Sequence, residues 1–229
     1  MKSSIFLAIA LLLGEFINAQ SAVDFANLAK YKDDNTKILN AKKKVDAVFM
    51  GNSITEGWVK THPEFFSENN YTGRGIGGQT TSQMLLRFQN DVVALKPRLV
   101  VINAGTNDIA QNTGTYDPDF TFNNIKAMAD IARSNGIKVI IASVLPAAAF
   151  PWRKEITNVS QKVDALNSRL KQYSLNNKLT FIDYNKAMRD EKGGMREGLS
   201  KDGIHPEPAG YSIMEPLIKN AVNKALGKK

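Results

Sequence analysis

Short runs of apolar, largely β-branched residues alternate along the chain with longer segments in which apolar residues recur at helical spacing. The short runs predict buried strands, because a strand covered on both faces is apolar at successive positions. Five strands are expected, at 45–50, around Tyr71, and at 98–103, 137–142 and 179–182. The longer segments predict helices at 21–44, 81–95, 120–134 and 156–174 and from Glu207 onward. This alternation indicates one domain with a parallel sheet covered by helices on both faces.

The first 19 residues have the form of a secretory signal peptide. Lys2 provides a positive amino-terminal region, residues 5–13 are continuously apolar, and the small Ala19 suits cleavage before Gln20. An uncleaved anchor is the alternative, but the apolar stretch is short for a membrane span and no stop-transfer flank follows it. We therefore expect a secreted or periplasmic protein whose mature domain spans 20–229, with no membrane association after cleavage.

The composition narrows the chemistry further. The 229 residues include no cysteine and only two histidines, His62 and His205. A disulfide framework, a thiol nucleophile and a lipid-bearing cysteine are therefore excluded, and a zinc site built from several histidines is not expected. The net charge is +8, with lysine clusters at 42–44 and 219–229. We interpret these clusters as solvated helix ends, since no nucleic-acid motif accompanies them.

Ser53 follows the first predicted strand, directly after Gly51 and Asn52. In a parallel sheet, the loops after the carboxyl ends of the strands lie at one edge, where ligands bind. A serine at this position is either a nucleophile or the N-cap of the next helix, and capping is the commoner role. The other loops of the chain decide between these two interpretations.

Three further loops bring polar groups to the same predicted edge. They carry Gly77-Gly78, the run Gly105-Thr106-Asn107-Asp108, and Asp202 with His205. Acyl transfer needs a serine hydroxyl, a histidine that takes its proton, and a carboxylate that orients the histidine. It also needs N–H donors for the oxyanion, which backbone groups and an amide side chain supply.

Together these loops resemble the four sequence blocks of the SGNH hydrolases, also called GDSL esterases. The blocks occur in the family's order, and the resemblance covers residues 45–219. They are Gly51-Asn52-Ser53-Ile54, Gly75-Ile76-Gly77-Gly78, Gly105-Thr106-Asn107-Asp108 and Asp202-Gly203-Ile204-His205-Pro206. Each block alone has low specificity, but four in order at plausible spacing are specific. The family's usual Asp before the nucleophile is Asn52 here, a change that leaves the expected triad intact.

The resemblance implies a serine esterase with a flavodoxin-like, three-layer α/β/α sandwich and a parallel five-stranded sheet. In this family pattern Ser53 is the nucleophile, His205 is the general base and Asp202 orients His205. The N–H groups of Ser53 and Gly78 and the side chain of Asn107 form the oxyanion hole. The resemblance implies no cofactor and no metal.

Two competing motifs and the second histidine do not define another site. The spacing Gly73-x-Gly75-x-x-Gly78 fits a dinucleotide fingerprint, but the next strand ends in Asn103 rather than in an acid. The nucleophile elbow Gly-x-Ser-x-Gly is absent, because Thr55 occupies the position of its last glycine. His62 has only Glu64 as a carboxylate at useful spacing, so we interpret it as a surface histidine.

The resemblance is closest to the branch that contains platelet-activating-factor acetylhydrolases and carbohydrate acetylesterases, which implies short acyl esters. Trp58, Tyr116 and Trp152 fall near the predicted active edge, and aromatic faces stack on sugars, so we expect a carbohydrate ester as substrate. Both tryptophans are equally typical of buried packing residues. A lysophospholipase or thioesterase is the alternative enzyme, and an inactive glycan-binding module is the alternative without catalysis. The sequence does not indicate the oligomeric state.

Overall fold

Five parallel strands form one sheet in the order β2-β1-β3-β4-β5. The computed structural model describes residues 24–228, so the predicted signal peptide lies outside the described residues. The strands are β1 Ala47–Gly51, β2 Tyr71–Gly75, β3 Leu99–Ile102, β4 Lys138–Ala142 and β5 Thr180–Ile182. The predicted five-stranded parallel sheet is confirmed, with each strand near its expected position.

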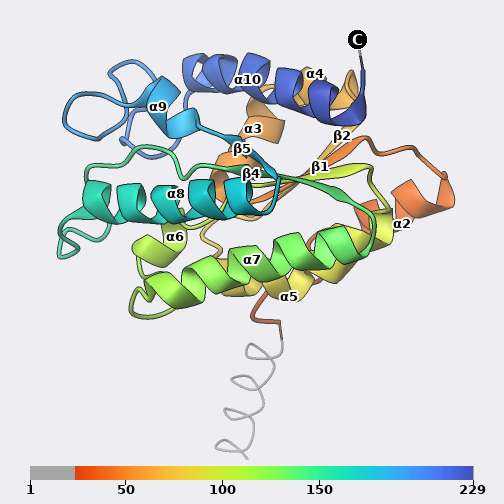
Figure 1. Ribbon diagram of the computed structural model, residues 1–229, viewed down its shortest axis with the longest axis horizontal. Coiled ribbons are helices and arrows are strands. Elements are labelled where there is room, and N and C mark those ends of the chain that lie inside the picture. The colour runs from red at the N-terminus through yellow and green to blue at the C-terminus, as the bar shows by residue number, and fades with distance from the viewer. Residues whose placement is uncertain (1–23, 229) are drawn as a thin grey trace, which may run out of the picture.

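Helices cover both faces of this sheet, which gives the predicted α/β/α sandwich (Figure 1). One layer contains α2 Lys32–Asn40, α5 Thr81–Asp91, α6 Thr106–Ile109, α7 Pro118–Ser134 and α8 Val159–Asn176, with the 3₁₀ turn η1 Val93–Leu95. The other layer contains α3 Ser53–Thr61, α4 Pro63–Ser67, α9 Tyr184–Met188 and α10 Pro208–Leu226. Within residues 24–228, no helix combines the length and the hydropathy that a bilayer crossing requires.

Strand β1 shows why the strands are apolar at successive positions. Val48 and Met50 pack into the core beneath α5, α7 and α8, whereas Ala47 and Phe49 pack beneath α3, α4 and α10. Successive side chains of a strand point to opposite faces, so a strand between two helical layers buries all of them. Every residue of β1 is buried, and the end of the strand is thereby held rigidly for the loop that follows.

The helices differ from their predicted bounds where single residues adopt left-handed backbone conformations. The expected helix at 21–44 is shorter, because in its described part Asn27 and Lys42 have positive φ angles and the helix spans only 32–40. Likewise α8 begins after Asn158, whose φ is +55°, rather than at residue 156. The short helices α4, α6 and α9 were not predicted, because four or five residues are too few to show helical periodicity.

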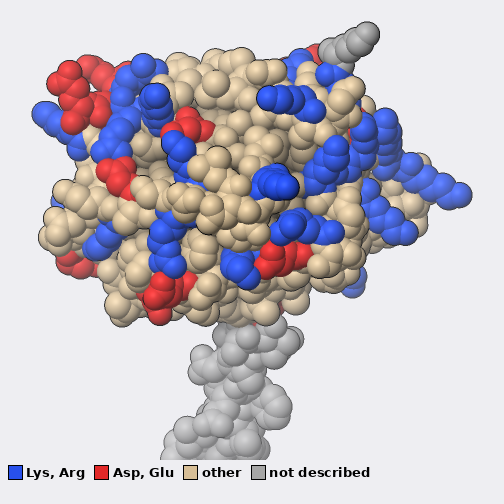
Figure 2. Space-filling view, in the orientation of Figure 1, with Lys and Arg blue, Asp and Glu red and all other residues tan. Residues whose placement is uncertain are grey.

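Lys44 and Lys228, one from each lysine cluster, lie at the edge of the sheet opposite Ser53. Asp46, just before β1, pairs with Lys228 at 2.9 Å, Arg98 at 3.2 Å and Lys44 at 3.7 Å. Figure 2 shows that Lys and Arg side chains are concentrated on the side of the molecule near the carboxyl terminus. Ser53 follows the other end of the same strand, so this positive surface is separated from it by the length of β1.

Candidate active site

Ser53 is the first residue of α3 and follows a tight turn at the end of β1. A Cβ atom at Gly51 would lie 2.0 Å from Thr55 Oγ1, so the turn requires glycine at this position. The N-cap is Asn52, whose side-chain oxygen accepts the N–H of Ile54 at 3.0 Å. The capping role considered for Ser53 is therefore taken by Asn52, and the Ser53 hydroxyl is left for another partner.

That partner is His205, which the fold brings to Ser53 across a separation of 152 residues. Ser53 Oγ and His205 Nε2 are 2.9 Å apart, and His205 Nδ1 is 2.6 Å from Asp202 Oδ2. With its proton on Nδ1, the imidazole donates to the carboxylate and Nε2 accepts from the serine hydroxyl. The three predicted residues thus form a continuous hydrogen-bonded chain from hydroxyl to carboxylate.

Asp202 is fixed by hydrogen bonds from its own loop, between α9 and α10. Its Oδ1 accepts the N–H of His205 at 2.8 Å, the N–H of Ile204 at 2.9 Å and the hydroxyl of Ser200 at 3.0 Å. Burial acts to raise the pKa of Asp202, but these bonds and the one from the His205 ring outweigh it and hold the pKa well below its ordinary value. Asp202 is therefore an ionised acceptor for the imidazole, oriented by its own loop.

The loop after β2 lies beside Ser53 and contacts helix α6. Gly78 has a φ of +75°, a conformation that favours glycine, and a Cβ at its neighbour Gly77 would lie 3.9 Å from the Cβ of Ser53. Asn107 is buried and its Nδ2 donates to the carbonyl of Gln79 at 2.9 Å. Among the hydrogen bonds formed by residues 24–228, none uses the backbone N–H of Ser53 or of Gly78.

Asp108 anchors the turn that carries Asn107, a role that the sequence analysis did not assign. Both of its carboxylate oxygens accept the N–H of Thr81 at 3.1 Å, and the hydroxyl of Thr81 also donates to it. Burial raises the pKa of Asp108, and the bonds from Thr81 and Thr121 oppose this effect. Helix α6 is thereby tied to Thr81, the first residue of α5.

Arg87 is a fully buried cation beneath the turn at Gly51 and the loop that carries Gly78. The sequence analysis did not assign it a role. Its guanidinium donates to Gln79 Oε1 at 2.6 Å, to Asp91 Oδ2 at 2.9 Å and to the carbonyl of Gly51 at 2.9 Å. One side chain therefore connects the turn before Ser53 with the loop that carries Gly78. The available signal was the i,i+4 pair of Arg87 and Asp91 on the same helix face as the apolar Met84 and Phe88.

The three predicted substrate-binding aromatics have different surroundings. Trp152 is 44% exposed and stacks on the ring of His205, with centroids 6.0 Å apart and planes at 29°. Tyr116 is half-buried against the core, and burial together with the nearby Asp108 raises its pKa to about 12. Trp58 is only 2% exposed and stacks between Phe65 and Tyr211. The expectation that Trp58 meets substrate is therefore wrong, because its ring is enclosed in the core.

His62 also differs from its predicted surroundings as an isolated surface residue. Its Nδ1 lies 2.6 Å from Glu215 Oε1, which also accepts the indole N–H of Trp58 at 3.0 Å. This carboxylate comes from α10, 153 residues later, so no local spacing revealed it. Tyr211 of the same helix donates to the carbonyl of Ile54 at 2.9 Å, which docks α10 onto the first turn of α3.

The site thus combines a paired hydroxyl and imidazole, an ionised carboxylate, and backbone N–H groups without protein acceptors. These are the groups that nucleophilic acyl transfer requires. Within the described residues 24–228, no group of three or more His, Asp or Glu side chains is arranged as metal ligands.

Comparisons with known proteins agree with this arrangement. Residues 49–213 match the model of the GDSL-like lipase/acylhydrolase family. A GDSL-like lipase from Bacteroides thetaiotaomicron has 52% identity and a TM-score of 0.84, with 88% of this chain and 100% of that chain covered. Platelet-activating factor acetylhydrolase IB subunit alpha2 from Rattus norvegicus is 27% identical, over 80% of this chain and 79% of the relative.

A more distant structure shares the fold alone. It is a catalytic mutant of an acetylxylan esterase from Geobacillus stearothermophilus, with 18% identity and a TM-score of 0.61. The match covers 77% of this chain and 93% of that chain.

Proposed function

Because the chain belongs to the GDSL-like lipase/acylhydrolase family and is a carboxylic ester hydrolase, we propose that Ser53, His205 and Asp202 are its catalytic triad. The observation that carries this proposal is the hydrogen-bonded chain from Ser53 Oγ through His205 to Asp202, with links of 2.9 Å and 2.6 Å. Membership of an enzyme family favours catalysis over an inactive glycan-binding module.

In the proposed acylation step, Ser53 Oγ attacks the ester carbonyl carbon while its proton passes to His205 Nε2. Asp202 is ionised and accepts the Nδ1 proton, so it stabilises the imidazolium that forms. The carbonyl oxygen becomes an oxyanion that accepts from the N–H groups of Ser53 and Gly78 and from Asn107 Nδ2. Collapse of this intermediate breaks the bond to the alcohol, which leaves with the proton from His205.

Deacylation repeats these steps with water as the nucleophile. His205 takes a proton from water, the resulting hydroxide attacks the acyl-enzyme carbonyl, and the same donors receive the second oxyanion. When the intermediate collapses, the Ser53–acyl bond breaks and His205 returns its proton to Ser53 Oγ. The products are a carboxylic acid and the free enzyme.

For the substrate, we propose short acyl esters, acetyl above all, carried on carbohydrate. The relative at 27% identity is named an acetylhydrolase, which supports a short acyl group. The exposed ring of Trp152 beside His205 supports a sugar on the alcohol side, because aromatic faces stack on sugars and this ring borders the base that protonates the leaving alcohol. The form of residues 1–19 supports secretion after cleavage before Gln20.

Two variants test the mechanism and the substrate separately. Ser53→Ala is expected to lower kcat for p-nitrophenyl acetate by about 10⁴-fold or more without unfolding the protein. More than a tenth of wild-type activity would remove Ser53 from the nucleophile role. Trp152→Ala is expected to raise KM for acetylated xylo-oligosaccharides and to leave KM for p-nitrophenyl acetate nearly unchanged. Faster turnover of lysophospholipids or long-chain thioesters than of acetylated sugars would favour the lipid-directed alternative.

A further inference from the structure

The loop that carries Gly78 is rich in glycine, yet side chains from several elements fix its backbone. Downstream, Asn107 Nδ2 donates to the carbonyl of Gln79, and Asn112 Nδ2 donates to the carbonyl of Gly78 at 3.0 Å. Upstream, the N–H of Gly77 donates to Glu56 Oε2 at 2.9 Å. Because glycine backbones have wide conformational freedom, these contacts on the two flanking peptides limit how the peptide between Gly77 and Gly78 can rotate.

Glu56 holds the preceding peptide, between Ile76 and Gly77, from the side of the nucleophile. It lies three residues after Ser53 in α3, so both side chains lie on neighbouring parts of one helix face. A Cβ atom at Gly77 would be 3.2 Å from Glu56 Oε2 and 3.9 Å from the Cβ of Ser53. The carboxylate and the nucleophile thus flank the same backbone unit.

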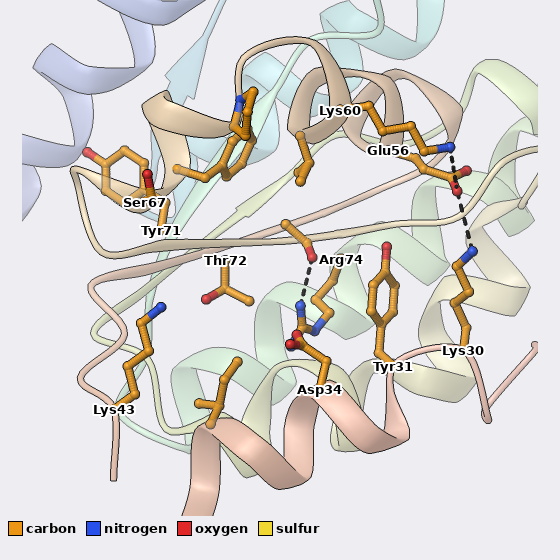
Figure 3. Close-up of a pocket in the computed structure, with 15 residues that line it drawn as sticks. Lys30, Tyr31, Asp34, Lys43, Glu56, Lys60, Ser67, Tyr71, Thr72 and Arg74 are labelled. Atoms are coloured by element: carbon orange, nitrogen blue, oxygen red, sulfur yellow. Dashed lines mark hydrogen bonds and ion pairs between the residues drawn. The ribbon is translucent and has the colours of Figure 1, made fainter. Parts of the chain in front are cut away.

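Two lysines balance the charge of this carboxylate. Glu56 Oε1 accepts from Lys60 Nζ at 3.1 Å and pairs with Lys30 Nζ at 3.5 Å (Figure 3). These side chains form one end of a cavity of about 420 Å³ between α2 and α3. Two ammonium groups beside one carboxylate offset the repulsion that a bare anion would exert on an oxyanion developing nearby.

We propose that Glu56 is a positioning residue that fixes Gly77 so that the N–H of Gly78 points at the oxyanion. This inference rests on the proposed function, and it assigns to Glu56 an effect through the loop rather than a contact with substrate. The side chain of Glu56 is 20% exposed and its ion pairs are near the surface, where such pairs contribute little to stability. Loss of the carboxylate should therefore affect turnover more than folding.

The test compares kcat, KM and melting temperature for three variants with p-nitrophenyl acetate. Glu56→Ala removes the acceptor of the Gly77 N–H and is expected to lower kcat about 10- to 100-fold, because a misplaced donor stabilises the transition state poorly. KM and the melting temperature should change little. Glu56→Gln keeps a side-chain oxygen for the Gly77 N–H and is expected to restore kcat to within about threefold of wild type.

Asp130→Ala is the matched control. Asp130 is a helical carboxylate that pairs with Lys126, four residues away, at 3.0 Å, but it lies on α7 in the opposite helical layer. Its loss removes the same kind of ion pair and also a bond from Tyr173, so melting temperature should fall while kcat stays constant.

The outcomes separate this inference from the proposed function. A kcat for Glu56→Ala within twofold of wild type would overturn the positioning role, even if Ser53→Ala is inactive. Equal losses in Glu56→Ala and Glu56→Gln would also overturn it, because they would make the charge, rather than the hydrogen bond, responsible. If Ser53→Ala remains active, it is the proposed nucleophile that fails.

Discussion

Replacing Asn107 by alanine distinguishes a catalytic role of its side-chain amide from a purely structural role. If Asn107 Nδ2 donates to the oxyanion, the bond strengthens as charge develops, so the loss falls on kcat while KM stays nearly constant. One such donor is worth about 10²- to 10³-fold in rate, or about 2.7–4 kcal/mol of transition-state stabilisation. We therefore expect kcat of Asn107→Ala to fall by that factor.

The same substitution has a separate cost in stability. Asn107 is buried and donates to the carbonyl of Gln79 at 2.9 Å, so the variant leaves that buried carbonyl without its donor. A group left unsatisfied in this way costs about 1–3 kcal/mol. For a domain of this size each kcal/mol lowers the melting temperature by roughly 2–4 °C. Asn107→Asp should be worse in both respects, because it presents an anion to the Gln79 carbonyl and to the oxyanion.

Asn103 provides the matched control for this measurement. It is equally buried, and its Nδ2 donates to the carbonyl of Ser143 at 2.9 Å, but we assign it no role in catalysis. Asn103→Ala should therefore show a similar loss of melting temperature with kcat unchanged. The assay is steady-state hydrolysis of p-nitrophenyl acetate with thermal melts of each variant. A folded Asn107→Ala enzyme with a kcat like that of Asn103→Ala would refute the oxyanion assignment.

His205→Ala should lower kcat by about 10⁴-fold or more, whereas His62→Ala should leave kcat nearly unchanged. A larger loss in His62→Ala than in His205→Ala would contradict the proposed base. Arg87→Met should lower both the melting temperature and the kcat of the folded fraction, because the carbonyl of Gly51 loses a buried donor; unchanged kcat would show that this link does not reach the site. The hydrogen bonds that the Asp202 carboxylate accepts hold its pKa well below the ordinary value of 3.8. Because this pKa is lower in the folded state, the ionised Asp202 stabilises the fold above pH 3.8, and this stabilisation is lost as the pH falls through the folded pKa. Asp202→Asn should therefore reduce the melting temperature at pH 7 and make progressively less difference as the pH falls below 3.8.

The strands could be predicted because burial on both faces leaves a simple local pattern. A run such as 99–102 is apolar at consecutive positions, since both neighbouring layers cover it. The helices could be located but not delimited, because their ends depend on single left-handed residues such as Asn158. Asparagine adopts this conformation more readily than its neighbours, but the sequence does not show which asparagines do so.

The residues of the site divide in the same way. Ser53, Asp202 and His205 were predicted because acyl transfer restricts which residue types serve and because the four sequence blocks resemble those of one family in the same order. Glu56 and Arg87 were missed because their partners lie in other elements, at separations that only packing reveals. Trp58 illustrates the reverse error, since a large aromatic near a strand end suits the core as well as a binding surface.

The docking of α10 onto α3 has a consequence for when activity appears. Tyr211 bonds to the residue after Ser53, and His205 lies in the loop that leads into the same helix. Contacts between such distant parts of a chain are costly to close and tend to form late in folding. On the proposed mechanism, a newly made chain would have the proposed nucleophile, Ser53, in place before the proposed base, His205, and would hydrolyse nothing until its carboxyl-terminal helix has packed. Recovery of esterase activity after dilution from denaturant would then time that closing step, rather than the earlier formation of the sheet.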